Sequence, residues 1–87
     1  MGNEKRNKEY CGVKFHSLKL LTKATNKVID DAGKRNHMVK VILPKGEDSF
    51  IIVFENRIHR DGFVTAITPY IYGEVEYSYV NNIKLED

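Results

Sequence analysis

The first periodic segment of the chain places apolar residues at helical spacing. Between Leu18 and Ala32, apolar or small side chains recur every three or four positions, which puts them on one face of a helix. Ser17 is a typical N-cap residue, and Gly33 stands where a helix commonly ends in a left-handed residue. The sequence therefore predicts a helix over residues 17–32.

After His37 the apolar positions alternate with polar ones, which indicates strands. Residues 38–43 alternate, with Val39, Val41 and Leu43 predicted on one face. Residues 49–55 form a near-continuous apolar run, typical of a strand that is buried on both faces.

A hairpin is predicted next, because Asp61-Gly62 is a favourable two-residue turn between strands. Residues 63–72 are accordingly expected to form a third strand. Residues 74–80 alternate cleanly and predict a fourth strand, and residues 83–85 are expected to add a short fifth.

These elements predict one α+β domain over residues 10–87, preceded by a flexible basic tail at residues 1–9. Residues 10–15 form a short mixed segment that is expected to pack across the domain. The N-terminal helix should cover a twisted four- to five-stranded antiparallel sheet, which could curl into a small barrel of the Sm-like or SH3-like kind.

Composition narrows the class of protein. The chain has 87 residues and 41% apolar residues, which suits one globular domain with a modest core. Its single cysteine, Cys11, excludes an internal disulfide and favours a reducing compartment. No apolar run is long enough to span a membrane and no signal peptide is evident, so a cytoplasmic location is expected.

Charge is divided along the chain. Residues 1–45 carry eleven Lys and Arg against four Asp and Glu, a net charge of +7, whereas residues 46–87 carry three against eight, a net charge of −5. A basic segment of this kind attracts polyanions, and the acidic segment could contact a basic protein or the basic half of a second copy.

The basic residues supply the candidate binding site. Lys19, Lys23 and Lys27 recur every fourth position and are expected to form a row along the predicted helix, with Lys34 and Arg35 at its end. Such a row can bind nucleic acid, with RNA favoured over DNA, or it can be an ordinary solvated helix face.

Catalytic candidates are few. His59, Arg57 and Thr65 gather around the predicted hairpin, and a His beside an Arg can move a proton near a phosphate. The three histidines have no metal-ligand spacing, so no metal and no cofactor are expected.

The order of a helix followed by bent strands over residues 17–85 is similar to the Sm-like RNA-binding fold. Residues 77–83 (Tyr-Ser-Tyr-Val-Asn-Asn-Ile) stand where that family has its last strands.

Residues 49–70 resemble the terminal strand pair of the barnase/colicin/RelE-like toxin ribonucleases, with Val64-Thr65-Ala66 followed soon by Pro69-Tyr70. That resemblance implies that Thr65, with His16 or His37, would be functional.

Three functions follow as hypotheses. The first is a small non-enzymatic module that binds RNA through the basic helix face. The second is an accessory or inhibitor protein of a phage or mobile element that binds a host protein. The third is a toxin-type ribonuclease.

Overall fold

The computed structural model describes residues 8–71 and 76–85 of the chain. Its elements, in chain order, are the strand β1 (Tyr10–Phe15), the 3-10 turn η1 (Leu18–Leu20), the helix α2 (Lys23–Arg35), the strands β2 (Met38–Ile42) and β3 (Phe50–Phe54), the helix α3 (Arg57–Ile71) and the strand β4 (Tyr77–Ile83). The α+β class is confirmed.

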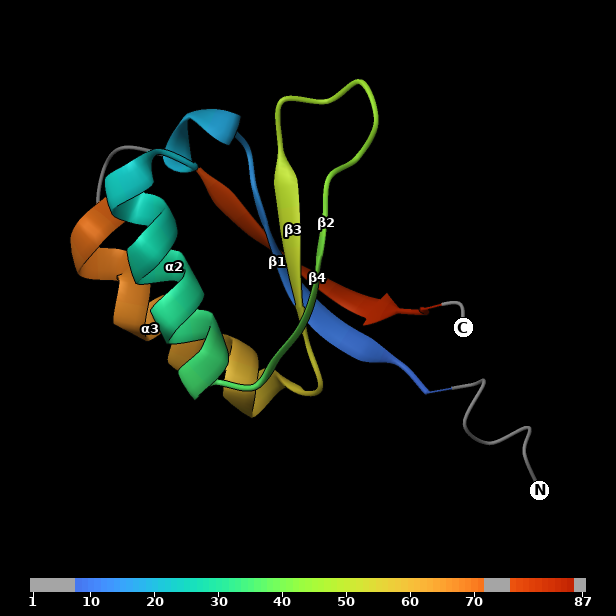
Figure 1. Ribbon diagram of the computed structural model, residues 1–87. Coiled ribbons are helices and arrows are strands. Elements are labelled where there is room, and N and C mark those ends of the chain that lie inside the picture. Colours follow the sequence, from blue (N-terminus) through green and yellow to red (C-terminus); the bar gives the residue numbers. More distant parts are fainter. Residues whose placement is uncertain (1–7, 72–75, 86–87) are drawn as a thin grey trace.

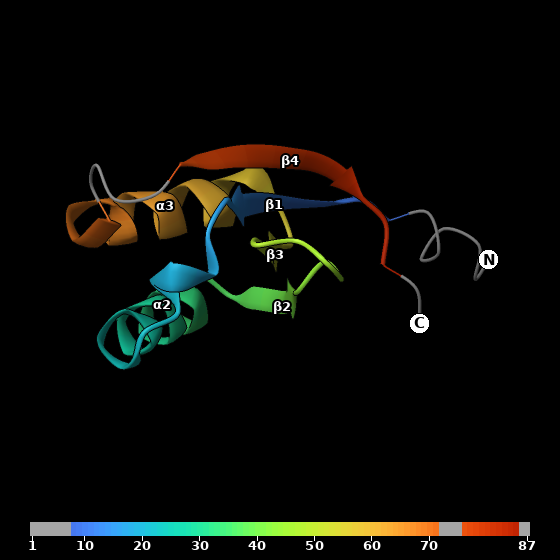
Figure 2. The same cartoon turned by 90° about the horizontal axis from the view of Figure 1, so that it is seen from above.

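The four strands form one antiparallel sheet in the order β2-β3-β1-β4, and both helices lie on the same face of it (Figures 1 and 2). This element order and strand order correspond to the split β-α-β motif of ferredoxin-like folds. The sheet is open, with β2 and β4 as its two edges, so the expected closure into a barrel is not confirmed.

The core lies between the sheet and the helices. Alternate residues of the two central strands point into it, with Val13 and Phe15 from β1 and Phe50, Ile52 and Phe54 from β3 all fully buried. Because side chains alternate across a strand, the other residues of β1 and β3 face away from the helices.

On that open face of the sheet, Gly12 of β1 leaves room for the Ile83 side chain of β4 and for the backbone of β3, because it carries no side chain. A Cβ atom at Gly12 would lie 2.8 Å from Ile83 Cδ1 and 2.9 Å from the Ile52 carbonyl oxygen. Val53, opposite Gly12, is fully buried although it lies outside the core cluster.

The predicted helix over residues 17–32 is divided in two. Ser17 caps the short turn η1 by accepting a hydrogen bond from the Lys19 N–H, and α2 begins later, where Thr22 and Thr25 form a capping box. Two caps in succession favour two separate helical starts over one continuous helix.

The predicted end of this helix was also wrong. Gly33 lies inside α2, where a Cβ atom would come within 2.8 Å of Met38 Sδ. The left-handed residue that follows the helix is His37, with a φ of 59°.

The predicted hairpin at Asp61-Gly62 and the third strand at residues 63–72 were wrong, because this region is helical as far as Ile71. Asn56 begins α3 by accepting a hydrogen bond from the His59 N–H at 3.0 Å. Gly62 does not form a turn. It allows α3 to lie close to the end of α2, since a Cβ atom there would lie 2.5 Å from Asn36 Oδ1.

The apolar positions of α3 have a helical period. Residues 60, 63, 64, 67 and 71 are buried at spacings of three and four, so one face of the helix contacts the core. Pro69 lies in the last turn, where the lack of its N–H costs one hydrogen bond near the helix end.

The strands predicted at residues 38–43 and 49–55 are confirmed as β2 and β3. The mixed segment at residues 10–15 is β1, a central strand of the sheet, which the sequence analysis did not predict. β4 extends to Ile83, and residues 84–85 add no fifth strand. The first residues of the predicted fourth strand, and residues 1–7 of the predicted tail, lie outside the described residues.

We expect Phe63→Ala to lower the free energy of unfolding by about 3–5 kcal/mol, because Phe63 is fully buried against Phe15 and Phe54. Ile58→Ala is the matched control, since Ile58 is 80% exposed on the same helix, and its effect should stay within about 0.5 kcal/mol. Urea unfolding followed by circular dichroism measures both. Equal losses of stability in the two variants would contradict the assignment of Phe63 to the buried face of α3 and of Ile58 to its exposed face.

Candidate functional site

The predicted basic row does not run along one helix. Lys19 is exposed on η1, whereas Lys27, Lys34 and Arg35 are exposed on α2; the side chain of Lys23 is outside the described part of the structure. The five cations are therefore carried by two elements that begin at separate caps.

Acidic neighbours reduce the positive charge of this face. Lys34 Nζ lies 3.0 Å from Asp30 Oδ2, and this hydrogen-bonded pair raises the pKa of Lys34, with a further electrostatic contribution from Asp31. Arg35 shares a shallow hollow between the two helices with Asp31 and Tyr70.

The three catalytic candidates all lie on α3, not around a hairpin. Arg57 is the first residue of the helix, Thr65 is exposed about two turns further along, and His59 is half-buried between them. The residue that His59 contacts is His37, with the two ring centroids 4.9 Å apart at 60°.

His16, the other histidine that the ribonuclease resemblance implied, lies elsewhere. Its ring nitrogen is 2.8 Å from Ser78 Oγ, so it joins β4 to the end of β1. Among the residues that the structure describes, no group of three or more His, Cys, Asp or Glu side chains could hold a metal ion.

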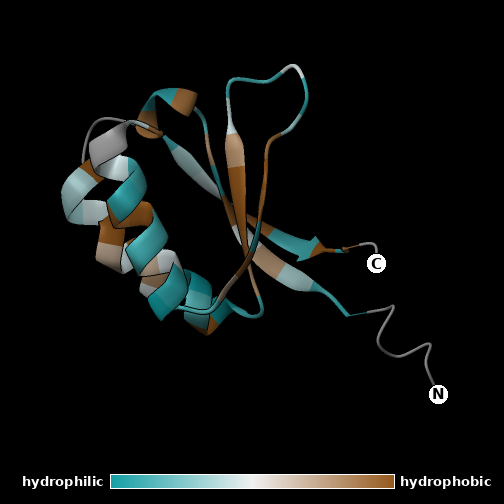
Figure 3. Ribbon diagram, viewed as in Figure 1, coloured by the Kyte–Doolittle hydropathy of each residue, from teal (hydrophilic) through white to brown (hydrophobic). Residues whose placement is uncertain are grey.

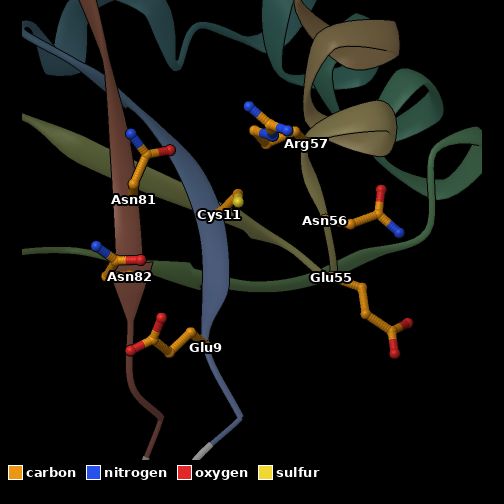
Figure 4. Close-up of a pocket in the computed structure, with 7 residues that line it drawn as sticks. All are labelled: Glu9, Cys11, Glu55, Asn56, Arg57, Asn81 and Asn82. Atoms are coloured by element: carbon orange, nitrogen blue, oxygen red, sulfur yellow. The ribbon is translucent and has the colours of Figure 1, made fainter.

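A polar hollow of about 490 Å³ opens where β1 and β4 approach the start of α3. Figure 4 shows the residues that line it, with the Cys11 thiol between Asn81 of β4 and Arg57 of α3. Glu9 and Glu55 also line it, and the Lys8 ammonium pairs with Glu55 and lowers the pKa of that carboxyl. Side chains of both charges and neutral amides line this hollow. The lining therefore does not favour either an anionic or a cationic ligand.

Arg60 is the one charged side chain within the described chain that is buried, at 5% exposure. Its guanidinium donates a hydrogen bond to Asn81 Oδ1 at 2.8 Å and lies 4.2 Å from the centre of the Tyr79 ring. Burial of an arginine is unfavourable without such partners. The contacts of Arg60 therefore stabilise the packing of α3 against β4.

A third hollow, of about 150 Å³, lies between α2 and the β2 edge of the sheet, and it is mainly apolar. It is lined by Leu21, Ile29, Met38, Val41, Leu43, Phe50 and Ile52, with Asn26 and Asp30 as its polar members. We call this hollow the edge groove. Figure 3 shows the hydrophobic colour along β3 and β2, and Figure 2 shows α2 beside β2.

Several apolar side chains of the edge groove are open to solvent. Leu43 is 62% exposed, Val41 43% and Leu21 37%. The neighbouring residues Leu18 and Val39 are exposed as well. Among the described residues, β2 pairs with β3 alone, so its outer edge still has backbone groups that are able to bond.

Near β2, the acidic side chains have hydrogen-bond partners, whereas two of the lysines take part in no ion pair among the described residues. The Glu47 carboxylate receives a hydrogen bond from Lys14 Nζ at 2.8 Å, which lowers the pKa of Glu47, and Asp48 accepts the Leu18 N–H at 2.7 Å. Lys40 and Lys45 are exposed and take part in none of the ion pairs within the described ranges.

The edge groove was missed by sequence reasoning, although its strand residues were assigned to one face. Val39, Val41 and Leu43 were predicted to share one face of a strand; Val41 and Leu43 both line the groove, whereas Val39, at the register shift between Met38 and Lys40, does not. Nothing local shows that this strand is an edge. One signal was present, because Leu43 precedes Pro44 and a polar turn and so lies at the border of the core.

Comparison of the chain with known protein families, with characterised proteins and with solved structures finds no match. No helix in the described ranges combines the length and the apolar character needed to cross a membrane.

We expect Arg60→Ala to lower the free energy of unfolding by about 2–4 kcal/mol, through loss of its charged hydrogen bond and its contact with the Tyr79 ring. Arg57→Ala removes the same charge from an exposed position of the same helix, and should change stability by less than about 0.5 kcal/mol. Thermal and urea unfolding compare the two variants, and a similar loss in both would mean that Arg60 does not fasten β4.

Proposed function

We propose that this protein is a small non-enzymatic binding module that docks a segment of a partner protein at the edge groove. The observation that carries the proposal is the coincidence, on β2, of an open strand edge and exposed apolar side chains beside an apolar hollow. This corresponds to the accessory-protein hypothesis, and it proposes a site for the partner.

Edges of this kind are usually protected in proteins that act alone. Natural sheets cover or shorten an edge strand, bend it with a bulge, or place several charges or a proline along it. β2 has a register shift between Met38 and Lys40, and Lys40 is its one charged residue. β2 thus carries two of these protective features, but its exposed side chains Val39 and Val41 still leave apolar surface that favours association with another chain.

Burial of the exposed side chains of the groove would favour binding. Covering apolar surface contributes about 25 cal/mol per Å², so each largely exposed aliphatic side chain that becomes buried can contribute on the order of 1 kcal/mol. Backbone hydrogen bonds along the strand would add directional specificity.

Site-specific photo-crosslinking tests the proposal. A photoreactive phenylalanine analogue replaces Leu43 in the full chain, and in a control it replaces Ile58, which is exposed on α3 away from the groove lining. In cells that make the protein, we expect the analogue at position 43, but not at position 58, to form an adduct with another protein. Val41→Asp should abolish this adduct. Equal adducts from both positions, or adducts with nucleic acid alone, would contradict the proposal.

RNA binding is a second candidate, favoured by the exposed cations Lys19, Lys27 and Arg35, which take part in none of the ion pairs in the described part of the chain. If α2 binds single-stranded RNA, Lys27→Ala and Arg35→Ala should each reduce the slope of log affinity against log salt by about 0.7. Fluorescence anisotropy at increasing salt measures this slope, with Lys84→Ala as the control. Absence of binding at low salt would exclude this candidate.

A further inference from the structure

We infer that β2 accepts an extended protein segment as an additional strand, and that this segment alternates apolar with acidic side chains. The inference rests on the proposed function and specifies the chemistry of the partner. It is argued from the two faces of β2, which differ in character.

The face of β2 toward the helices is apolar. Val41 lies opposite the core residue Ile52, and Leu43 follows on the same face, so both line the edge groove. A strand paired with β2 would place every second side chain on this face, beside Val41 and Leu43. Those side chains must be apolar, because the groove offers few polar partners and its one carboxylate, Asp30, is already paired with Lys34.

The opposite face of β2 carries a cation. Lys40 lies opposite Val53, on the open face of the sheet, and is exposed, whereas Ile42, opposite Ile51 on the same face, is half-buried. The intervening side chains of an added strand would lie on this face, and one of them would lie next to Lys40. Oppositely charged pairs across neighbouring strands are stabilising and like charges are destabilising, so an acidic side chain is favoured there.

A second copy of the chain fits this edge less well. Residues 38–45 contain two lysines and no acidic residue, so β2 of another copy cannot supply the carboxylate. An antiparallel pairing centred on Lys40 would also place the two Lys40 side chains directly opposite each other, which is unfavourable. β2 of a second copy is therefore a poor occupant, and we infer a segment of a different protein; the test below distinguishes this from β4 of a second copy, where Glu76 precedes Tyr77 and Tyr79.

Synthetic peptides test the inference with the full-length protein. The probes are fluorescently labelled, acetylated peptides in which Val alternates with Glu or, in the control, with Lys. Two further probes are Val-Glu peptides in which the backbone nitrogens are methylated either at every Val or at every Glu. We expect the Val-Glu peptide to bind at least about tenfold more tightly than the Val-Lys peptide, and methylation of the edge that faces β2 to abolish binding.

Two pairs of protein variants locate the site. Lys40→Glu should reverse the preference between the two peptides, whereas Lys27→Glu, the same charge change on α2, should not. Leu43→Ser should weaken binding about tenfold, whereas Ile58→Ser, which removes an exposed apolar side chain elsewhere, should leave it unchanged. Circular dichroism confirms that each variant is folded.

Each other outcome overturns part of the inference. Equal affinity for both peptides would exclude acidic selectivity, and binding that survives methylation in both backbone registers would exclude strand addition. A dimer that Leu43→Ser dissociates and that excludes the peptides would make a second copy the occupant. A crosslink at position 43 without peptide binding would leave the protein-docking proposal standing and remove this partner chemistry.

Discussion

The stacked contact between Phe15 and Phe50, with ring centroids 5.0 Å apart, joins the two central strands and sets the position of the core. Phe15 also contacts Phe63 of α3 and Tyr77 of β4, at 6.4 and 6.0 Å between ring centroids. A chain of 87 residues can build only one such core. Because the core is centred on β1 and β3, β2 contributes only Met38 to its margin, and the rest of that strand is left at the surface.

Local sequence patterns predicted the elements whose structure depends on local periodicity. The alternation in residues 38–43 and 49–55 identified β2 and β3, because side chains in a strand change face at every residue. The Asp61-Gly62 pair misled the prediction because a glycine is needed there for a contact between helices, with Asn36 at its closest point. That requirement comes from tertiary packing and is not visible in the dipeptide. The helical spacing of Phe63, Val64 and Ile67 was the competing signal, and it prevails in the structure.

The candidate site could be predicted only in part, because it too depends on tertiary arrangement. Its groove combines residues from the end of η1, from α2, from β2 and its continuation, and from β3, which are consecutive in the chain. The sequence does not show that the strand order places β2 at an edge of the sheet, which leaves these apolar side chains uncovered. The cations were visible in the sequence, but their partners were not, since Lys34 is paired with Asp30 within its own helix. Counting charges along the chain therefore overstated the basic character of α2 and said nothing of the apolar edge beside it.

The pairing of Tyr10 with Ile83 has a consequence for how this domain could be joined to others. Because β1 and β4 are neighbours, the first and last strand residues of the described chain lie side by side at one end of the sheet. β2 is the opposite edge, and both of its ends continue into elements of the same domain. A fused domain or a surface attachment at either end of these strands would therefore leave along β1 and β4, with the β2 edge facing away from the point of attachment. The topology thus separates the place where the domain can be tethered from the β2 edge, which we propose as its binding site.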